Sequence, residues 1–290
     1  MDQNLVINLN KPKDMSSHEA VKKVKRLFSA KKAGHAGTLD PLATGILLVC
    51  INEATKITRF LSDMEKEYDV RLKFGERTDT YDSTGRVIEK KEVFFLKETH
   101  ISEVLNKFVG RIRQMPPMYS AIKINGQPLY KLARRGMSIE RQERMVDIYK
   151  IDITSFNLPY LDLKIACSKG TYIRTLCDDI GDALDIGAHM VSLKRTKIGI
   201  FRIEDSVSIE DLNYKKTARH SIDSALSHLP EIVLDKDTYF RAKNGMPISI
   251  AAGKSYINQH VKLKTPENIV FGIGRIKNDL IIIERILSLN

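Results

Sequence analysis

The clearest candidate for chemistry in this sequence is a carboxylate, Asp40, in a glycine-punctuated loop. The loop reads GHAGTLDPLATG from Gly34 to Gly45, and Pro41 biases the backbone of Asp40 away from a helical conformation. A carboxylate in a sheltered site can act as a base or as a nucleophile. An Asp-Pro pair is often only a turn, so the residues alone leave both interpretations open.

The motifs of cofactor-dependent enzymes are missing from the sequence. No dinucleotide-binding glycine pattern, phosphate-binding P-loop or G-x-S-x-G elbow occurs. The histidines lack partners at metal-ligand spacing, and Cys50, Cys167 and Cys177 show no paired spacing, which predicts buried free thiols. The expected reaction therefore needs protein side chains alone, with no cofactor and no metal.

Positive charge is concentrated in the segment 110–150. The chain carries a formal charge of +11, and this segment holds nine Lys or Arg against three Asp or Glu, a local +6. Tyr119, Tyr130 and Tyr149 are interleaved with the cations. Cations for phosphates and flat rings for bases are typical of an RNA-binding segment. The alternative is a solvated charged face.

The elements around these residues predict an α+β fold on a mixed, mostly antiparallel sheet. Tyr68 alternates with apolar residues in a strand that ends at Gly75, so its side chain points to the core face. Arg174 falls in the first turns of a helix, where a cation gains nothing from the helix dipole and needs another partner. Strands are expected at 5–9, 46–51, 68–74 and 161–167, and helices after the Ser16–Glu19 capping box, at 100–109 and around 173–180.

The length of 290 residues predicts one large domain and a small one. A more polar stretch over 205–230 is expected to be a helical connection, and the apolar runs 269–276 and 280–286 are expected to form a small β domain. No run of about eighteen apolar residues and no secretion leader occurs. We therefore expect a cytoplasmic protein without a membrane partner.

The Asp40 loop also carries a family resemblance. GHAGTLDPLATGILLV resembles the active-site motif of the bacterial tRNA pseudouridine synthases that modify uridine 55 in the T arm. Four further segments resemble the same family in the same order: NKPKDMSSHEAV from Asn10, EYDVRLKFGERTDTYDSTG from Glu67, QMPPMYSAIKINGQPLYKLARRG from Gln114 and CSKGTYIRTLCDDIG from Cys167. The resemblance covers roughly the first 205 residues.

The resemblance implies a domain plan and a reaction. A pseudouridine synthase catalytic domain would span 1–230, with an RNA-gripping insertion at about 117–145, and a small β, PUA-like RNA-binding domain would span 231–290. The enzyme would flip uridine 55 of tRNA out of its stack, cleave the bond between C1′ and N1, turn the base and rejoin it through C5. It would act as a monomer, with no protein partner and no cofactor. Covalent attack on the sugar and a glycal route both stay open.

The resemblance also implies roles for individual residues. Asp40 matches the essential aspartate of the family. Tyr68 matches a tyrosine that packs on the flipped base and takes the C5 proton, with a purely core role as the alternative. Arg174 matches an arginine that pairs with the aspartate and keeps it ionised, with a surface salt bridge as the alternative.

Other matched residues are expected to support the site or contact RNA. His35 would occupy space near the vacated stack, unless it makes only a local hydrogen bond. Lys11, with Pro12, would be supporting structure, with a phosphate contact as the alternative. The remaining residues expected to line the pocket or bind RNA are Tyr172, Leu193, Arg134 and Arg135.

Two rival functions stay open from the sequence. One is an RNA-binding or RNA-folding protein without catalysis, and the other is a pseudouridine synthase for a different RNA. The presence of Asp40, Tyr68 and Arg174 together favours an enzyme, and the insertion favours free tRNA. In the C-terminal part, YFRAKNGMP from Tyr239 and the later FGIGRI resemble the small β domain. The segment between them departs from the family pattern, which leaves the contribution of this domain to RNA binding open.

Overall fold

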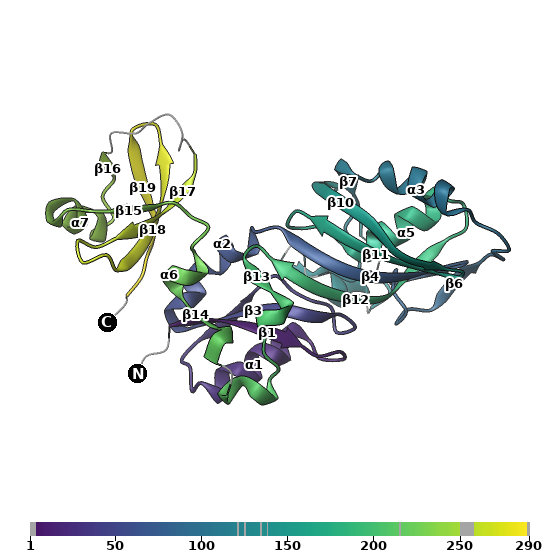
Figure 1. The fold of residues 1–290 in the computed structure, drawn as a ribbon, viewed down its shortest axis with the longest axis horizontal. Helices are drawn as coiled ribbons and strands as arrows, with labels where there is room; N and C mark the ends of the chain where they lie inside the picture. Colours follow the sequence, from purple (N-terminus) through teal and green to yellow (C-terminus); the bar gives the residue numbers. More distant parts are fainter. Residues whose placement is uncertain are drawn as a thin grey trace.

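The computed structural model describes residues 4–288, apart from 121, 125, 134, 138, 215 and 250–257. Within these residues one ten-stranded sheet forms the larger part of the protein and a five-stranded sheet forms the smaller part (Figure 1). The main path of the large sheet runs β14 (Arg219–Ser221), β1 (Leu5–Lys11), β3 (Thr44–Ile51), β12 (Ala188–Ile198), β4 (Lys66–Phe74), β11 (Tyr160–Cys167), β10 (Arg144–Asn157) and β7 (Gly110–Gln114). Two short strands join it at the side: β2 (Ala33–Ala36) pairs with β3, and β13 (Phe201–Arg202) pairs with β12.

Strand β12 connects the two halves of the large sheet. It runs parallel to β3, with Arg195 opposite Gly45, and antiparallel to β4, with Arg195 opposite Tyr68. The other strand pairs of this sheet are antiparallel. The expected α+β fold on a mostly antiparallel sheet is therefore confirmed, with one parallel pair at its centre.

Helices pack on the large sheet through their apolar faces. Helix α1 (Ser17–Leu27) begins at the expected capping box of Ser16 and Glu19 and buries Val21 and Val24 against residues of β1 and β3. Helix α5 (Ile173–Ala183) packs Leu176, Cys177 and Ile180 into the main core, together with α3 (Glu98–Asn106). Burying each such side chain contributes roughly 1.5–3 kcal/mol, so this core fixes α5 against β4 and β12.

Two expectations about local structure were wrong. The loop 34–45 was expected to be irregular, but its first residues belong to β2, because their backbone pairs with the end of β3. The stretch 205–230 was expected to be a helical connection, but its described residues, all except 215, form only short helical segments and strand β14, which pairs with β1. These segments are η2 (Ile203–Asp205), η3 (Glu210–Asn213), η4 (Lys216–Ala218) and α6 (Ile222–Ala225).

The small sheet follows the order β15 (Glu231–Val233), β17 (His260–Lys264), β18 (Val270–Lys277), β19 (Leu280–Ile286) and β16 (Ile248–Ser249). It also carries a helix that was not expected from the sequence, α7 (Lys236–Lys243), and the Asp235 side chain caps this helix by accepting from the amide of Thr238. Val270 and Ile273 share an apolar cluster with Leu48 of the large sheet. The two sheets are therefore joined by packing as well as by the chain.

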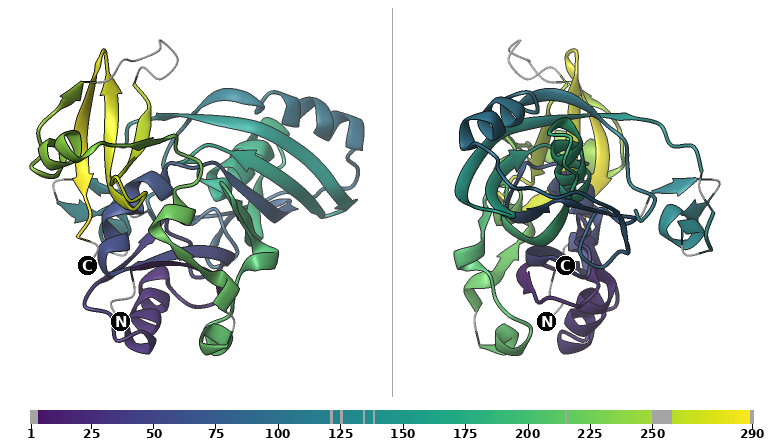
Figure 2. Two further views of the ribbon diagram at one scale, coloured as in Figure 1. Left: turned by 60° about the vertical axis from the view of Figure 1, so that its left-hand side comes forward. Right: turned by 90° about the vertical axis from the view of Figure 1, so that its right-hand side faces the viewer.

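Several short elements surround this framework. The segment 52–62 forms η1 (Asn52–Ile57) and α2 (Thr58–Ser62), and a hairpin pairs β5 (Glu76–Thr78) with β6 (Val87–Lys90). In the basic segment, β8 (Lys123–Ile124), β9 (Gln127–Pro128) and α4 (Leu129–Ala133) lie apart from both sheets (Figure 2). The three cysteines are free and buried, as expected. None of the described helices is long and apolar enough to cross a membrane.

Candidate functional site

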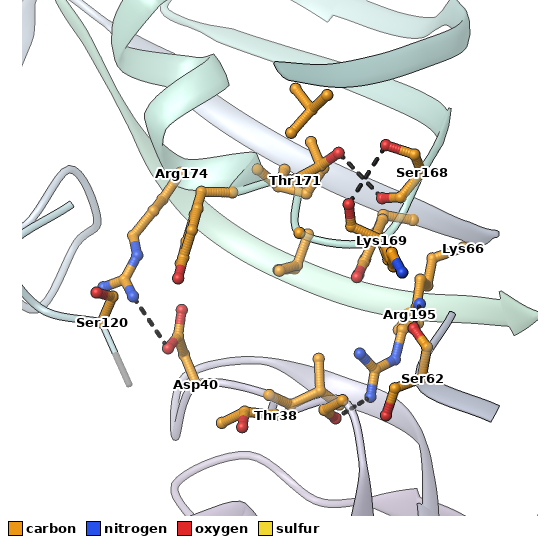
Figure 3. Close-up of a pocket in the computed structure, with 18 of the residues that line it drawn as sticks. Thr38, Asp40, Ser62, Lys66, Ser120, Ser168, Lys169, Thr171, Arg174 and Arg195 are labelled. Atoms are coloured by element: carbon orange, nitrogen blue, oxygen red, sulfur yellow. Dashed lines mark hydrogen bonds and ion pairs between the residues drawn. The ribbon is translucent and has the colours of Figure 1, made fainter. Parts of the chain in front are cut away.

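A cavity of about 500 Å³ opens beside the central strands and collects residues that are far apart in the sequence. It is formed by the Asp40 loop, the starts of β4 and α5, and the middle of β12 (Figure 3). Five residues expected at the site line this cavity: Asp40, Tyr68, Tyr172, Arg174 and Leu193. The structure therefore brings together the core of the predicted site.

The loop that carries Asp40 is tied to helix α1. The hydroxyl of Ser17 donates to the carbonyl of Leu39 and accepts from the amide of Leu39, both at 2.8 Å. The amide of Ala43 donates to the carbonyl of Asp40 at 3.1 Å, which closes a turn just after it. These bonds hold the backbone on both sides of Asp40.

Lys11 supports the same loop from behind. Its fully buried ammonium donates to the carbonyls of Pro12, Met15 and Pro41, at 2.8, 2.7 and 3.3 Å. Burial lowers the pKa of Lys11 to about 8, although the nearby Asp40 carboxylate acts in the opposite direction. Lys11 does not line the cavity, so its contacts in the structure are those of a support.

Arg174 lies between two carboxylates. Its Nη2 donates to Oδ1 of Asp40 at 3.1 Å and to the carbonyl of Tyr119 at 2.6 Å. Its Nη1 lies 3.6 Å from Oδ2 of Asp82. Asp82 is buried and accepts hydrogen bonds from Thr80 and Thr84. Arg174 is therefore held by two carboxylates. These are the partners that its position in the first turns of a helix led us to expect.

The electrostatic environment of Asp40 has opposing parts. Burial raises the pKa of Asp40, the guanidinium of Arg174 lowers it, and the carboxylate of Asp82 raises it. About a third of the Asp40 side chain, 32%, is still exposed, and this surface faces the cavity. The carboxylate is thus surrounded by protein yet accessible to a molecule in the cavity.

Tyr68 and Leu193 lie beside this carboxylate on neighbouring strands. Both side chains are 7% exposed, and both contribute to the cavity wall and to the main apolar core. Burial raises the pKa of the Tyr68 hydroxyl, and the guanidinium of Arg195 partly offsets this rise. A half-apolar wall with one phenol is suited to the face of a flat ring.

Tyr172 is the N-cap residue of helix α5. Its amide donates to Oε1 of Gln114 at 2.7 Å, and Nε2 of Gln114 donates to its carbonyl at 3.0 Å. This pair of bonds fixes the backbone just before Arg174 and ties α5 to β7. Burial raises the pKa of the Tyr172 hydroxyl, and the charges of Arg144 and Arg174 partly offset this rise.

Three residues of the site were not expected from the sequence: Asp82, Arg195 and Lys66. Asp82 was contained in the turn-rich motif after Gly75 but was given no role there. Arg195 lies two residues after Leu193 on the same strand, so alternation along β12 places both on the cavity side. That spacing was the available signal. Lys66 lies two residues before Tyr68 and lines the cavity with it.

Two further residues expected to bind RNA, His35 and Arg135, do not line the cavity. His35 sits in β2 opposite Val49, and its buried Nδ1 has no hydrogen-bond partner within the described part of the chain. Burial and the charge of Arg195 lower the pKa of His35. Arg135 is exposed just after α4, and Arg134 lies outside the described residues. No group of His, Cys, Asp and Glu in the described ranges is arranged to hold a metal ion.

Comparison with known proteins identifies the family. Residues 25–173 match the N-terminal domain of the TruB family pseudouridylate synthases, and residues 174–240 match the C-terminal domain of tRNA pseudouridylate synthase B. The tRNA pseudouridine synthase B of Clostridium tetani is 45% identical over 84% of this chain and 86% of its own length. That of Haemophilus influenzae strain 86-028NP is 40% identical over 98% of this chain and 95% of its own length.

Solved structures agree with this match. A Cbf5-Nop10-Gar1 complex contains a chain that is 26% identical, with a TM-score of 0.77 over 98% of this chain and 85% of that chain. An H/ACA RNP bound to a substrate RNA containing 2′-deoxyuridine gives 25% identity and a TM-score of 0.75 over 99% of this chain and 86% of that chain. The chain belongs to the TruB family of pseudouridylate synthases.

Proposed function

We propose that this enzyme converts uridine 55 in the T arm of tRNA to pseudouridine. The observation that carries the proposal is the ion pair of Asp40 and Arg174 in a cavity that Tyr68 also lines. The relatives described above are named for tRNA pseudouridine synthesis, which favours tRNA as the substrate. We propose that the protein works as a monomer in the cytoplasm, without a protein partner.

The size and position of the cavity support base flipping. A volume of about 500 Å³ lies within the usual range for a small-molecule site, so one nucleotide fits where a duplex does not. Asp40 lies within this cavity, and C1′ of a uridine stacked in an RNA loop could not reach it. The target nucleotide therefore leaves its stack and enters the cavity, and its base packs on Tyr68 beside Leu193.

The proposed reaction moves one bond from nitrogen to carbon. The bond between C1′ and N1 breaks and its electron pair stays with the base. Asp40 acts as an ionised carboxylate, which either attacks C1′ or removes a sugar proton to give a glycal. The base then turns, a bond forms between C1′ and C5, and Tyr68 accepts the proton that C5 loses. Arg174 keeps Asp40 ionised, because a cation 3.1 Å away favours the charged form.

The remaining expected residues have supporting roles in this proposal. Lys11 holds the catalytic loop, His35 occupies the space that the flipped base vacates, and Tyr172 contacts the nucleotide at the cavity entrance. Arg134 and Arg135 bind phosphates of the T arm within the insertion 117–145. We propose a catalytic domain over 1–230 and a small β, PUA-like RNA-binding domain over 231–290, in keeping with the second sheet that begins at β15.

Mapping pseudouridine in a defined RNA tests the proposal. The protein is incubated with a T-arm hairpin and with full-length tRNA, and the modified positions are mapped. We expect conversion at the one uridine that corresponds to position 55, and none in a hairpin that has cytidine there. Conversion at another uridine, or binding without conversion, would overturn the assignment. Light scattering on the purified chain, whose mass is 33.0 kDa, tests the monomer.

A further inference from the structure

One end of the cavity holds two buried cations that lack an acidic partner. The side chains of Arg195 and Lys66 both line the cavity and are 1% and 5% exposed. Arg195 donates from Nε to the carbonyl of Ile46 at 2.8 Å and from Nη2 to that of Gly37 at 3.0 Å. Lys66 donates to the carbonyls of Ser62 and Met64. Within the described residues neither cation forms an ion pair.

This arrangement differs from that of the other buried arginine at the site. Arg174 lies between the carboxylates of Asp40 and Asp82, so its charge is compensated within the protein. A buried charge without a counter-ion costs several kcal/mol, and it is retained where another molecule supplies the opposite charge. Burial lowers the pKa of Lys66 to about 8; the charge of Arg195 adds to this effect, and Asp63, which also lines the cavity, opposes it. The missing component at this end of the cavity is therefore an anion.

Arg195 lies where we expect the base of the bound nucleotide rather than its sugar. Arg195 lies opposite Tyr68 in the pairing of β12 with β4, and the charge of its guanidinium lowers the pKa of the Tyr68 hydroxyl. Figure 3 shows Asp40 and Arg195 reaching into the cavity from separate places on its wall. A base that packs on Tyr68 with C1′ at Asp40 would place its ring edge toward Arg195.

The reaction itself generates an anion at this place. When the bond between C1′ and N1 breaks, the electron pair remains on the uracil ring and is delocalised over N1 and the carbonyl oxygens. This ring must stay in the cavity, and must turn, before C5 forms the new bond to C1′ and releases its proton. We propose that Arg195, with Lys66 beside it, binds the detached uracil anion during this turn. This inference rests on the proposed function.

The geometry of Arg195 favours this anion over a phosphate of the RNA backbone. A phosphate is bound best by two parallel donors of one guanidinium edge. In Arg195 the edge of Nε and Nη2 already donates to the carbonyls of Ile46 and Gly37, and the guanidinium also interacts with the Tyr68 hydroxyl, so no free pair of parallel donors remains for a phosphate. A single donor beside a flat wall suits the carbonyl oxygen of a ring. A preorganised donor aimed at developing charge is also an effective form of catalysis.

The first experiment measures how the charge of a bound pyrimidine affects its affinity. The probes are uracil, which is neutral near pH 7, and 5-nitrouracil, which ionises readily, titrated by calorimetry between pH 5 and pH 8. For the parent protein we expect 5-nitrouracil to bind more tightly as it ionises, by about tenfold or more relative to uracil. This preference should disappear in Arg195→Gln and weaken in Lys66→Met. It should survive in Arg71→Gln, an exposed arginine of β4 that pairs with Asp162.

Two results of this titration would overturn the inference. The first is equal affinity of the folded parent protein for the neutral and the anionic pyrimidine. The second is binding of inorganic phosphate that is lost in Arg195→Gln while binding of 5-nitrouracil persists, because the site would then be a phosphate site. Circular dichroism checks that each variant is folded. If Arg195→Gln does not fold, Lys66→Met, in which the preference should weaken, provides the comparison.

The second experiment separates charge stabilisation from mere positioning of the loop. Single-turnover cleavage is compared on hairpins that carry uridine or 5-fluorouridine at the target, because fluorine makes the departing ring a more stable anion. We expect Arg195→Gln to slow cleavage of the uridine substrate by about 10²-fold or more, and to slow cleavage of the 5-fluorouridine substrate clearly less. Equal slowing of both substrates would reduce Arg195 to a positioning residue. Failure of the parent enzyme on both substrates would instead reject the proposed function.

Discussion

Nη2 of Arg174 lies 3.1 Å from Oδ1 of Asp40, although 134 residues separate them in the chain. The same guanidinium is 3.6 Å from Asp82, so one cation serves two carboxylates of different exposure. Asp40 keeps about a third of its surface open to the cavity, whereas Asp82 is buried. The buried carboxylate therefore anchors Arg174, and the open one remains accessible to substrate.

Replacing Asp40 with Asn tests its assignment as the reactive carboxylate. The amide keeps the size of the side chain but removes the charge and the nucleophile, so conversion should fall by on the order of 10³ or more. Affinity for the T-arm hairpin should stay within several-fold. Single-turnover rates and filter binding measure the two effects. Residual conversion above about a tenth of the parent rate would remove Asp40 from the chemistry.

The dependence of the rate on pH should follow the charges around Asp40. Because burial raises the pKa of this carboxylate, the rate should fall on the acid side at a pH above 3.8, the usual value for Asp. Arg174→Gln removes the cation that lowers this pKa, so the fall of the rate on the acid side (the acid limb) should move to higher pH. Asp82→Asn removes the carboxylate that raises it and should move the limb to lower pH.

Single-turnover rates between pH 4 and pH 8 measure these shifts. Arg71→Gln is the matched control, because Arg71 is exposed and pairs with Asp162 instead. Its acid limb should coincide with that of the parent enzyme. Shifts of the same sign in Arg174→Gln and Asp82→Asn would show that the limb does not report the ionisation of Asp40.

Tyr68→Phe tests the late step of the reaction. The ring that packs on the base remains, and because stacking contributes roughly 1–3 kcal/mol per base, RNA binding should survive. Loss of the hydroxyl should slow only the removal of the C5 proton. RNA labelled with tritium at C5 should then be rearranged but release tritium slowly. If both processes keep their parent rates, Tyr68 has only a packing role.

Gly45→Ala should damage the junction between the Asp40 loop and β3. Gly45 has a φ of +96°, and an added Cβ would lie 2.3 Å from the carbonyl oxygen of Arg195. We expect a loss of about 1–3 kcal/mol in the free energy of unfolding, together with slower conversion. Gly34→Ala is the control, because nothing lies within 4 Å of its Cβ position. Denaturant titrations of both variants measure the difference, and equal stabilities would contradict the close approach.

The basic segment should make RNA binding depend on salt. Each phosphate that the protein neutralises releases counterions, so the logarithm of affinity falls with the logarithm of salt concentration. Replacing Arg134 and Arg135 together with Ala should reduce this slope by about one to two. Arg71→Ala is the control and should leave the slope near that of the parent protein. An unchanged slope and affinity in the double variant would indicate a solvated face.

Much of the fold was predictable because its local signals are strong. The Ser16–Glu19 capping box marked the start of α1, and the alternation around Tyr68 placed that side chain on the core face. Both depend on residues close in sequence. Strand β2 was not predictable in this way, because only its pairing with the end of β3 defines it.

The residues of the site differ in the same way in how far the sequence could indicate them. Motif resemblance pointed to Asp40, Tyr68 and Arg174, and the structure places them around one cavity. Asp82 could not be selected from the sequence, and the available signal for Arg195 was only its spacing from Leu193. Their importance comes from contacts across the fold, with Arg174 in one case and with Gly37 and Ile46 in the other.

The central place of β12 constrains the order in which a working enzyme can form. Strands β3 and β4, which flank it, are synthesised more than a hundred residues earlier. A growing chain that ends before Ala188 therefore has two partial sheets, each with an unpaired edge that could join another chain. When β12 enters, it pairs along β4 and with Thr44 and Gly45 of β3, and it brings Leu193 and Arg195 to the cavity at the same time. Protection from misassembly and completion of the site thus depend on the same late segment.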